Sequence, residues 1–200
     1  MSVLEKLKLY LEREDGTLAE VSNVFEKITD GIKNTNSDHS AHHSGYGNLA
    51  SSLFSLNAGA IKEFSFKSPS TLYAHLKNIK LQTLGSSIKL EILKNVTVTT
   101  DTGTSVSIRN TNDNSSNVAQ STIKQSPTYS GGTVWDDAVA LADSTNQYTG
   151  NAEINSSENQ ELITKTSNVY YILKFTNIGD STAEVYFKMF FYEESKGLID

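Results

Sequence analysis

The spacing of hydrophobic residues changes period partway along the chain, and this change separates an N-terminal segment from the rest. In residues 1–13 apolar side chains recur at offsets of three and four between charged ones, a pattern that predicts an amphipathic helix. Asp15-Gly16 interrupts the pattern, and Thr17 with Glu20 then matches a capping sequence that predicts a second helix. We therefore expect an amphipathic helical arm over residues 1–33.

An arm of two short helices cannot bury its apolar stripes by itself. The stripes must pack on the rest of the protomer, on a neighbouring subunit or on another protein. Packing within the protomer is favoured for the second helix, whereas both alternatives stay open for the first. If the arm binds a partner, the contacts come from its apolar positions, which are Val3, Leu4, Leu7, Tyr10, Leu11, Leu18, Val21, Phe25 and Ile28.

Beyond the arm, residues 34–52 are polar and contain glycine, which predicts a linker. From Leu53 onward the period becomes two, and β-branched or aromatic residues alternate with polar ones in several short runs. About seven or eight strands at short spacing predict a β-sandwich over residues 53–200. The expected fold is mainly β, a jelly-roll-like β-sandwich with an N-terminal helical arm.

Two hairpins are predicted within this domain. The first has its turn at Asp101-Thr102-Gly103, where Gly and Asp are typical turn residues. The second joins two long aromatic and β-branched runs, Val169–Thr176 and Ala183–Tyr192, across a short polar loop.

The stretch between these hairpins, residues 110–160, is rich in Asn, Ser and Thr. A structureless segment of that length is unusual inside a compact domain. We therefore expect strands near Gln120–Lys124 and Thr133–Trp135, and a helical turn over residues 136–142.

Composition and charge narrow the classes of function. Ser, Thr and Asn make up 63 of the 200 residues and only 20% are charged, which is typical of loops and solvated sheet faces and not of a charge-rich disordered chain. The net charge of −6 argues against nucleic-acid binding. The absence of a long apolar run predicts no transmembrane helix and no signal peptide. With no cysteine, thiol catalysis, cysteine-ligated metals and disulfides are excluded.

Two groups of residues have the chemistry of metal ligands. His39, His42 and His43 could bind an ion if three copies met on a trimer axis, but a solvated linker is favoured because a zinc site needs ligands held by further contacts. Four aspartates outside the linker could supply loop oxygens to Ca²⁺. They lack the spacing of an EF-hand, so turn-forming roles are favoured. These acidic residues are Asp101, Asp113, Asp136 and Asp137. We expect no metal and no cofactor.

Catalysis has little support in the sequence. The chain has no Gly-x-Ser-x-Gly elbow, no His-Glu-x-x-His pair and no phosphate-binding glycine loop. His75 lies in a strand-like run, which favours a packed or interface histidine over a general base. A small hydrolase is therefore the least favoured hypothesis, and no enzymatic activity is expected.

Several short motifs follow one another in a characteristic order along the domain. They are Ile92–Thr97, Gly103-Thr104, Asn110–Asn117, Ser126–Thr128, Gly131–Thr133, Tyr170–Asn177 and Phe191–Glu193. Over residues 53–193 this order resembles a group of tailed-phage virion proteins described as capsid decoration, cement or minor structural proteins. In that group the Asn-rich stretch carries arginines where this chain has Thr111 and Asp113. The resemblance implies a β-sandwich mounted on the outer surface of the capsid, with the major capsid protein as partner and many weak contacts that gain strength from copy number.

An alternative within the virion is a tail, baseplate or fibre component whose sandwich binds host glycans. Tyr129, Trp135 and Tyr148 lie in or near polar loops and could stack on sugars, although a role in the core is favoured for Trp135. In either case we expect assembly in the host cytoplasm and no membrane contact. A homotrimer is also expected, because the aromatic runs at Tyr170-Tyr171 and Phe187–Tyr192 would place bulky side chains on both faces of their strands.

Overall fold

The computed structural model describes residues 10–12, 18–20, 45–142, 149–154 and 162–194, and the chain divides into two units, Met1–Ala41 and His42–Asp200. In the first unit, strand β1 (Tyr10–Glu12) pairs antiparallel with strand β2 (Leu18–Glu20), with Leu11 opposite Ala19. The structure describes no helix in either unit within these ranges.

The β1–β2 pair corrects the predicted helical arm at the six positions that are described. Three predicted contact residues, Tyr10, Leu11 and Leu18, lie in strands. Short apolar runs do not distinguish the helical from the strand period, and Asp15-Gly16, taken as a helix end, is also a favoured hairpin dipeptide. The other predicted contact residues lie outside the described residues; they are Val3, Leu4, Leu7, Val21, Phe25 and Ile28.

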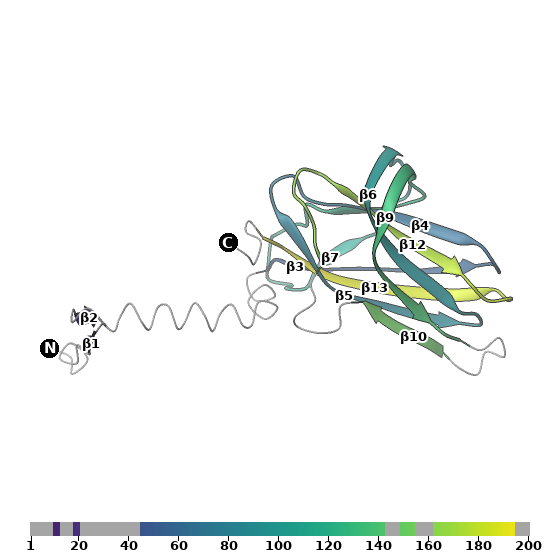
Figure 1. Cartoon of the computed structure of the whole chain (residues 1–200), viewed down its shortest axis with the longest axis horizontal. Helices are drawn as coiled ribbons and strands as arrows, with labels where there is room; N and C mark the ends of the chain where they lie inside the picture. Colours follow the sequence, from purple (N-terminus) through teal and green to yellow (C-terminus); the bar gives the residue numbers. More distant parts are fainter. Residues whose placement is uncertain (1–9, 13–17, 21–44, 143–148, 155–161, 195–200) are drawn as a thin grey trace. The chain divides into compact units, whose positions relative to one another are not determined.

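The second unit is a β-sandwich of two antiparallel sheets (Figure 1). The five-stranded sheet has the order β8 (Thr122–Gln125), β4 (Ile61–Lys67), β12 (Tyr170–Asn177), β6 (Ile88–Thr100) and β9 (Thr128–Ala140). The six-stranded sheet has the order β10 (Thr149–Ile154), β5 (Tyr73–Leu84), β13 (Ala183–Glu194), β3 (Gly47–Leu56) and β7 (Ile108–Asn110). Its sixth strand, β11 (Leu162–Ile163), also pairs with β5.

The domain starts earlier than the sequence predicts. Strand β3 begins at Gly47, so residues 47–52 belong to the sandwich and not to a linker. Their polar composition suggested a linker, but the small residues Asn48 and Ala50 are buried. β3 pairs with β13 along its whole length, from Gly47 opposite Tyr192 to Leu56 opposite Ala183.

The predicted C-terminal hairpin is wrong, because β12 and β13 lie in different sheets. The crossover between them is held by the buried side chain of Asn177. Its Nδ2 donates to the carbonyl oxygens of Leu56 and Ser181, at 2.8 Å each. Its Oδ1 accepts from Ser86 Oγ at 2.8 Å and from the Gly179 N–H at 3.0 Å. One amide thus has four partners, which fixes the point at which the chain changes sheet.

The predicted hairpin at Asp101-Thr102-Gly103 is also wrong. β6 pairs with β9, and β7 pairs with β3 in the other sheet. The chain after β6 packs closely on β8, where a Cβ on Gly103 would lie 1.7 Å from the Gln125 carbonyl oxygen. Glycine is therefore required here for a close approach of two backbones and not for a hairpin turn.

Between residues 110 and 160 the prediction is partly right. Strands β8 and β9 occur near the two predicted positions. The helical turn predicted over 136–142 is wrong, since β9 continues to Ala140 opposite Ile88. Pairing with the buried part of β6 therefore overrides the weak helical preference of that segment.

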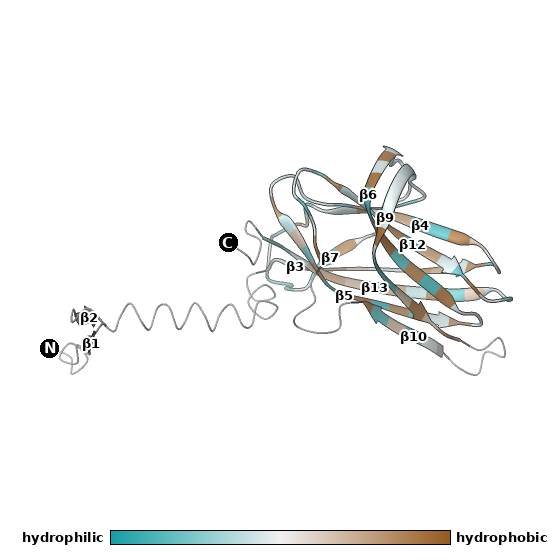
Figure 2. Cartoon of the chain, viewed as in Figure 1, coloured by the Kyte–Doolittle hydropathy of each residue, from teal (hydrophilic) through white to brown (hydrophobic). Residues whose placement is uncertain are grey.

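The core between the sheets is built around four phenylalanines, two from each sheet. Phe54 on β3 and Phe187 on β13 face Phe64 on β4 and Phe175 on β12. The Phe64–Phe187 ring centroids are 5.1 Å apart, and those of Phe54 and Phe175 are 5.4 Å apart, both pairs edge to face. Such contacts add to the free energy gained by burying the rings. Figure 2 shows the matching alternation of apolar and polar bands along strands such as β6.

The aromatic residues of strand β13 are divided unequally between its buried and its exposed face. Its inward side chains are fully buried, and they are Val185, Phe187, Met189 and Phe191. Of the aromatic residues after them, Tyr192 is buried and stacks on His75, with centroids 4.5 Å apart. Tyr186 and Phe190 are the aromatic residues that remain at least partly exposed on this strand. The excess of aromatic surface that motivated a homotrimer is therefore smaller than the sequence suggests, and the homotrimer stays a prediction.

Adjacent residues on β13 test this arrangement. Phe187→Ala should lower the free energy of unfolding by about 3–5 kcal/mol, because it opens a cavity in the phenylalanine cluster. Tyr186→Ala, one position away on the outward face, should cost about 1 kcal/mol or less. Urea unfolding of dilute protein measures both values. Equal losses for the two variants would contradict the assignment of inward and outward faces.

Candidate interaction surface

The outer face of the five-stranded sheet is covered by part of its own chain. The paired segments 94–100 and 128–134, here called the β6–β9 ribbon, extend past the end of β12. Asp101, directly after the ribbon, accepts a 2.5 Å hydrogen bond from Ser65 on β4. The Lys124 ammonium donates to the Asp101 carbonyl at 2.8 Å. Since β12 lies between β6 and β4, about 10 Å apart in a sheet, the ribbon must bend over β12.

A tyrosine in the ribbon makes the second contact of this kind. The Tyr129 hydroxyl donates to Glu63 Oε1 on β4 at 2.5 Å. Burial raises the pKa of Tyr129 well above its ordinary value, and the hydrogen bond to the Glu63 carboxylate raises it further. Gly131 and Gly132 in the ribbon have φ angles of 71° and 114°, which favour glycine and permit the bend. The ribbon thus closes this face with polar contacts.

Four further charged groups on the same sheet form one network. The Glu91 carboxylate lies 2.8 Å from the Lys89 ammonium and 3.5 Å from that of Lys174. The hydrogen bond from Lys89 lowers the pKa of Glu91. Lys89 also lies 3.7 Å from Asp137. A face whose charges are already neutralised in this way offers little to a charged partner.

Two of the three residues predicted to stack on glycans have partners within the protein. Trp135 stacks on Tyr171 with centroids 5.1 Å apart, lies under the Lys94 ammonium and packs against the core. Trp135 is thus partly buried against the core, the position that the sequence analysis favoured. Tyr129 is held by Glu63, and Tyr148 lies outside the described residues.

The asparagine-rich segment of the resemblance has a structural role. The Asn110 side chain donates to the Gly45 carbonyl oxygen at 2.7 Å, which ties the loop to the start of the sandwich. Its Oδ1 accepts from the Asn112 N–H at 2.8 Å, and Asn112 Oδ1 accepts from the Asn114 N–H at 3.0 Å. These are successive Asx turns. The side-chain oxygens of Asn110 and Asn112 are thus hydrogen-bond acceptors within the loop.

The other candidate ligands are dispersed or lie outside the described residues. Asp101 binds Ser65 and Lys124, Asp113 is exposed in the asparagine-rich loop, and Asp137 lies near Lys89. The Asp136 carboxylate accepts from the backbone N–H of its neighbour. Within the described ranges, no three His, Asp or Glu residues come together as a metal site. His39, His42 and His43 lie outside those ranges.

His75 is a packed histidine, as predicted. Its side chain is fully buried, it stacks on Tyr192, and its Nε2 lies 3.0 Å from Glu194 Oε1. Nearby, the buried Glu193 carboxylate accepts from the backbone N–H groups of Gln120 and Ser121 at 2.9 and 2.7 Å. These contacts attach the loop before β8 to the end of β13, which is a structural role.

Large apolar side chains are exposed on both sheets, among them Ile61 and Val139 on the five-stranded one. On the outer face of the six-stranded sheet two of them lie side by side. Leu53 on β3 is 69% exposed and lies directly opposite Tyr186 on β13, which is 36% exposed. Tyr186 in turn lies opposite Gln82 on β5, and Gln82 lies opposite Asn151 on β10. This row of four residues crosses the sheet.

Charged residues lie on either side of that row. Toward the C-terminal end of β13, Lys188 lies opposite Lys80, which is 4.0 Å from Glu153. Toward its N-terminal end, Glu184 lies opposite Leu84 and hydrogen-bonds Ser55. We call the surface formed by the Leu53–Tyr186 row and these flanking rows the open face.

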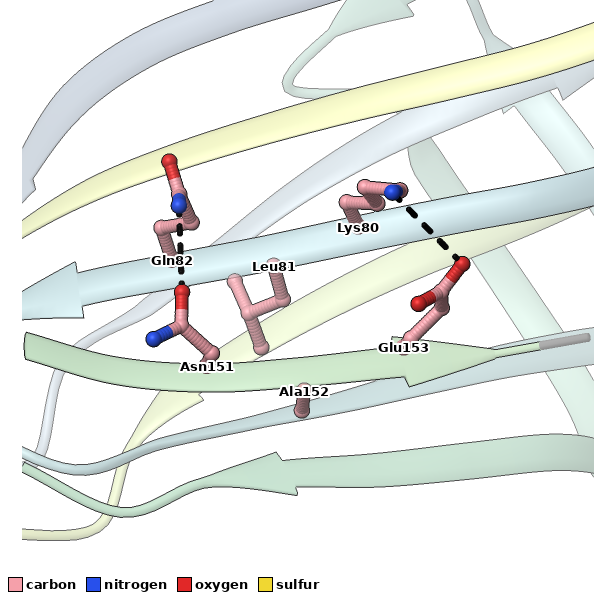
Figure 3. Close-up of a pocket in the computed structure, with 6 residues that line it drawn as sticks. All are labelled: Lys80, Leu81, Gln82, Asn151, Ala152 and Glu153. Carbon is pink, nitrogen blue, oxygen red and sulfur yellow. Dashed lines mark hydrogen bonds and ion pairs between the residues drawn. The ribbon is translucent and has the colours of Figure 1, made fainter. Parts of the chain in front are cut away.

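A shallow pocket of about 430 Å³ adjoins the open face between β5 and β10 (Figure 3). Gln82 Nε2 donates to Asn151 Oδ1 at 3.0 Å at one end of it. At the other end, Glu153 binds Lys80 and accepts from Asn78. The lining residues are Lys80, Leu81, Gln82, Asn151, Ala152 and Glu153.

The open face was missed in the sequence analysis. Leu53 begins the first apolar run, and a leucine in such a run is expected to face the core. Leu53 instead points outward, because its neighbour on β3, Phe54, packs against the core. Leu53 itself lies opposite Tyr186 of β13. The signal available in the sequence was the charged alternation of Glu184 and Lys188 around Tyr186, which marks an outward row.

Comparison with protein-family models and with curated proteins finds no match to this chain. Among the described residues, no helix has the length and apolar character needed to cross a membrane. The function is therefore inferred from the fold, from the open face and from the resemblance in motif order.

The raised pKa of Tyr129 predicts a pH dependence. Above about pH 10 the tyrosines of the unfolded chain lose their protons, whereas folded Tyr129 keeps its proton, so the folded state binds more protons. The free energy of unfolding must then fall as the pH rises. Tyr129→Phe should weaken this fall. Urea midpoints at about pH 8 and about pH 10.5 measure it, since this interval spans the ordinary pKa of tyrosine.

Tyr46→Phe is the matched control, because it removes a half-exposed hydroxyl of the same domain. Its pH dependence should follow that of the natural chain. If Tyr129→Phe also followed the natural chain, the contact between the ribbon and Glu63 would not hold the Tyr129 proton.

Proposed function

We propose that this chain is a virion structural protein that decorates the outer surface of a phage capsid through multivalent, non-covalent contacts. The single observation that carries the proposal beyond the motif resemblance is the open face, a rigid and partly apolar surface. A protein with exposed apolar surface on a stable sheet is suited to binding another protein. Many copies on a symmetric lattice make weak individual contacts sufficient.

The proposal includes assignment of the sandwich to the jelly-roll class. Eight longer strands, taken in chain order, are β3, β4, β5, β6, β9, β10, β12 and β13. The first, eighth, third and sixth are neighbours in one sheet, and the second, seventh, fourth and fifth are neighbours in the other. This order supports two interlocked Greek keys, the arrangement of jelly rolls in viral capsid and lectin domains. Fold alone does not decide function.

The motifs that carry the resemblance support a shared architecture more than a shared binding site. Gly103 allows close packing on β8, Gly131 and Gly132 lie at the bend of the ribbon, and the asparagine segment ties the loop to Gly45. These residues stabilise the β6–β9 ribbon and the start of the sandwich at Gly45. The contact with the major capsid protein is therefore proposed for the residues of the predicted arm, and the open face is proposed as a further protein-binding surface.

The second candidate is a tail, baseplate or fibre component that binds a glycan. The observation that favours it is the pocket beside Tyr186, since amide, ammonium and carboxylate groups next to an aromatic ring suit sugar hydroxyls and a sugar face. This site replaces Tyr129 and Trp135, whose side chains have partners inside the protein.

Copy number separates the two candidates. Quantitative mass spectrometry of purified phage particles, grown from a genome that encodes this chain, gives its ratio to the major capsid protein. A decoration protein should be present at a ratio of at least about one to ten, because it repeats with the lattice. A ratio of a few copies per particle would favour the tail component. Absence from the particle would contradict both candidates.

A further inference from the structure

The open face has a charge pattern that is complementary to itself. On β13, Glu184 and Lys188 stand two positions to either side of Tyr186, and all three point outward. Consider a second copy related by a two-fold axis that runs across the strands at the level of Tyr186. This rotation reverses the strand direction, so it places Glu184 of one copy against Lys188 of the other, twice.

We propose that the open face binds the open face of a second copy, forming a face-to-face dimer with antiparallel strands. At its centre Tyr186 and Leu53 meet their own counterparts and bury apolar surface that is exposed in the protomer. Sheets pack at about 10 Å face to face, which leaves room for side chains of this size. This inference does not rest on the virion proposal.

The charges also select the orientation of the axis. A two-fold axis parallel to the strands and centred on β13 would place Glu184 against Glu184 and Lys188 against Lys188, which is repulsive. Within the protomer Lys188 already lies opposite Lys80, a like-charge pair across the sheet. A carboxylate close to Lys188 relieves this repulsion. The two-fold axis that runs across the strands places the Glu184 carboxylate of the second copy there.

The size of the face predicts a weak dimer. Four strands and three outward rows correspond to roughly 400 Å² on each copy, from strand spacing and rise. Stable interfaces bury about 800 Å² on each partner. Association should therefore depend on concentration, with dimer forming in the micromolar range or above, and it should strengthen where copies are crowded together.

Reciprocal charge reversal tests the pairing in the full-length chain. Sedimentation equilibrium over a wide range of protein concentrations measures the dimer dissociation constant. Glu184→Lys or Lys188→Glu alone places like charges together twice in each dimer, and each should weaken the dimer about tenfold or more. The double variant Glu184→Lys/Lys188→Glu exchanges both partners and should return to within about threefold of the natural dimer.

Lys165→Glu is the matched control, because it reverses an exposed lysine in a loop away from the open face. It should leave the dimer unchanged, and circular dichroism melting checks that every variant is folded. The proposal is overturned if the natural chain stays monomeric at all concentrations, if its limiting mass is that of a trimer, or if the folded double variant associates as weakly as the single ones.

The absence of cysteine allows a second, independent measurement. Gln82 lies in the central row, so Gln82→Cys places a thiol opposite its own copy while Leu53 and Tyr186 are retained. A short bis-maleimide reagent should then join two chains efficiently. Thr122→Cys, exposed on β8 of the other sheet, is the control. Equal crosslinking of the two variants would contradict a dimer through the open face.

Discussion

The contact between four phenylalanine rings, two from each sheet, is the interaction on which the rest of the structure depends. Phe54 and Phe187 meet Phe64 and Phe175 midway between the sheets. Because these rings fix which side of each strand faces inward, they also fix the outward rows at every second position. The exposed positions of Leu53 and Tyr186 are consequences of burying their neighbours Phe54 and Phe187.

The two outward faces that result differ in what lies over them. On the five-stranded sheet the β6–β9 ribbon bends over β12, and Tyr129 and Asp101 attach it to β4. On the six-stranded sheet no described segment is tied down in that way over the Leu53–Tyr186 row, which stays exposed. The ribbon occupies part of one face, whereas the adjacent exposed residues Leu53 and Tyr186 favour protein contacts at the open face.

Sequence periodicity predicted the β-sandwich, because alternation reports burial directly. Periodicity failed where the sheet or the face that a residue joins is decided by residues far away in the sequence. β12 and β13 follow one another closely in the sequence, yet they lie in different sheets. The four hydrogen bonds of Asn177 stabilise the crossover between them. The six described positions of the predicted arm lie in strands. The helical prediction failed there because three-residue segments do not define a period. The open face could not be predicted because Leu53 is assigned to it only by its register with Tyr186.

The central claim is that the open face makes protein contacts on the outside of a virion. Cryo-electron microscopy of intact particles that contain this chain tests it most directly. The expected map shows the sandwich outside the capsid shell, with the row of Leu53 and Tyr186 covered by the shell or by a second copy. A map with the sandwich absent from the capsid surface, or with that row facing solvent in every copy, would contradict the claim.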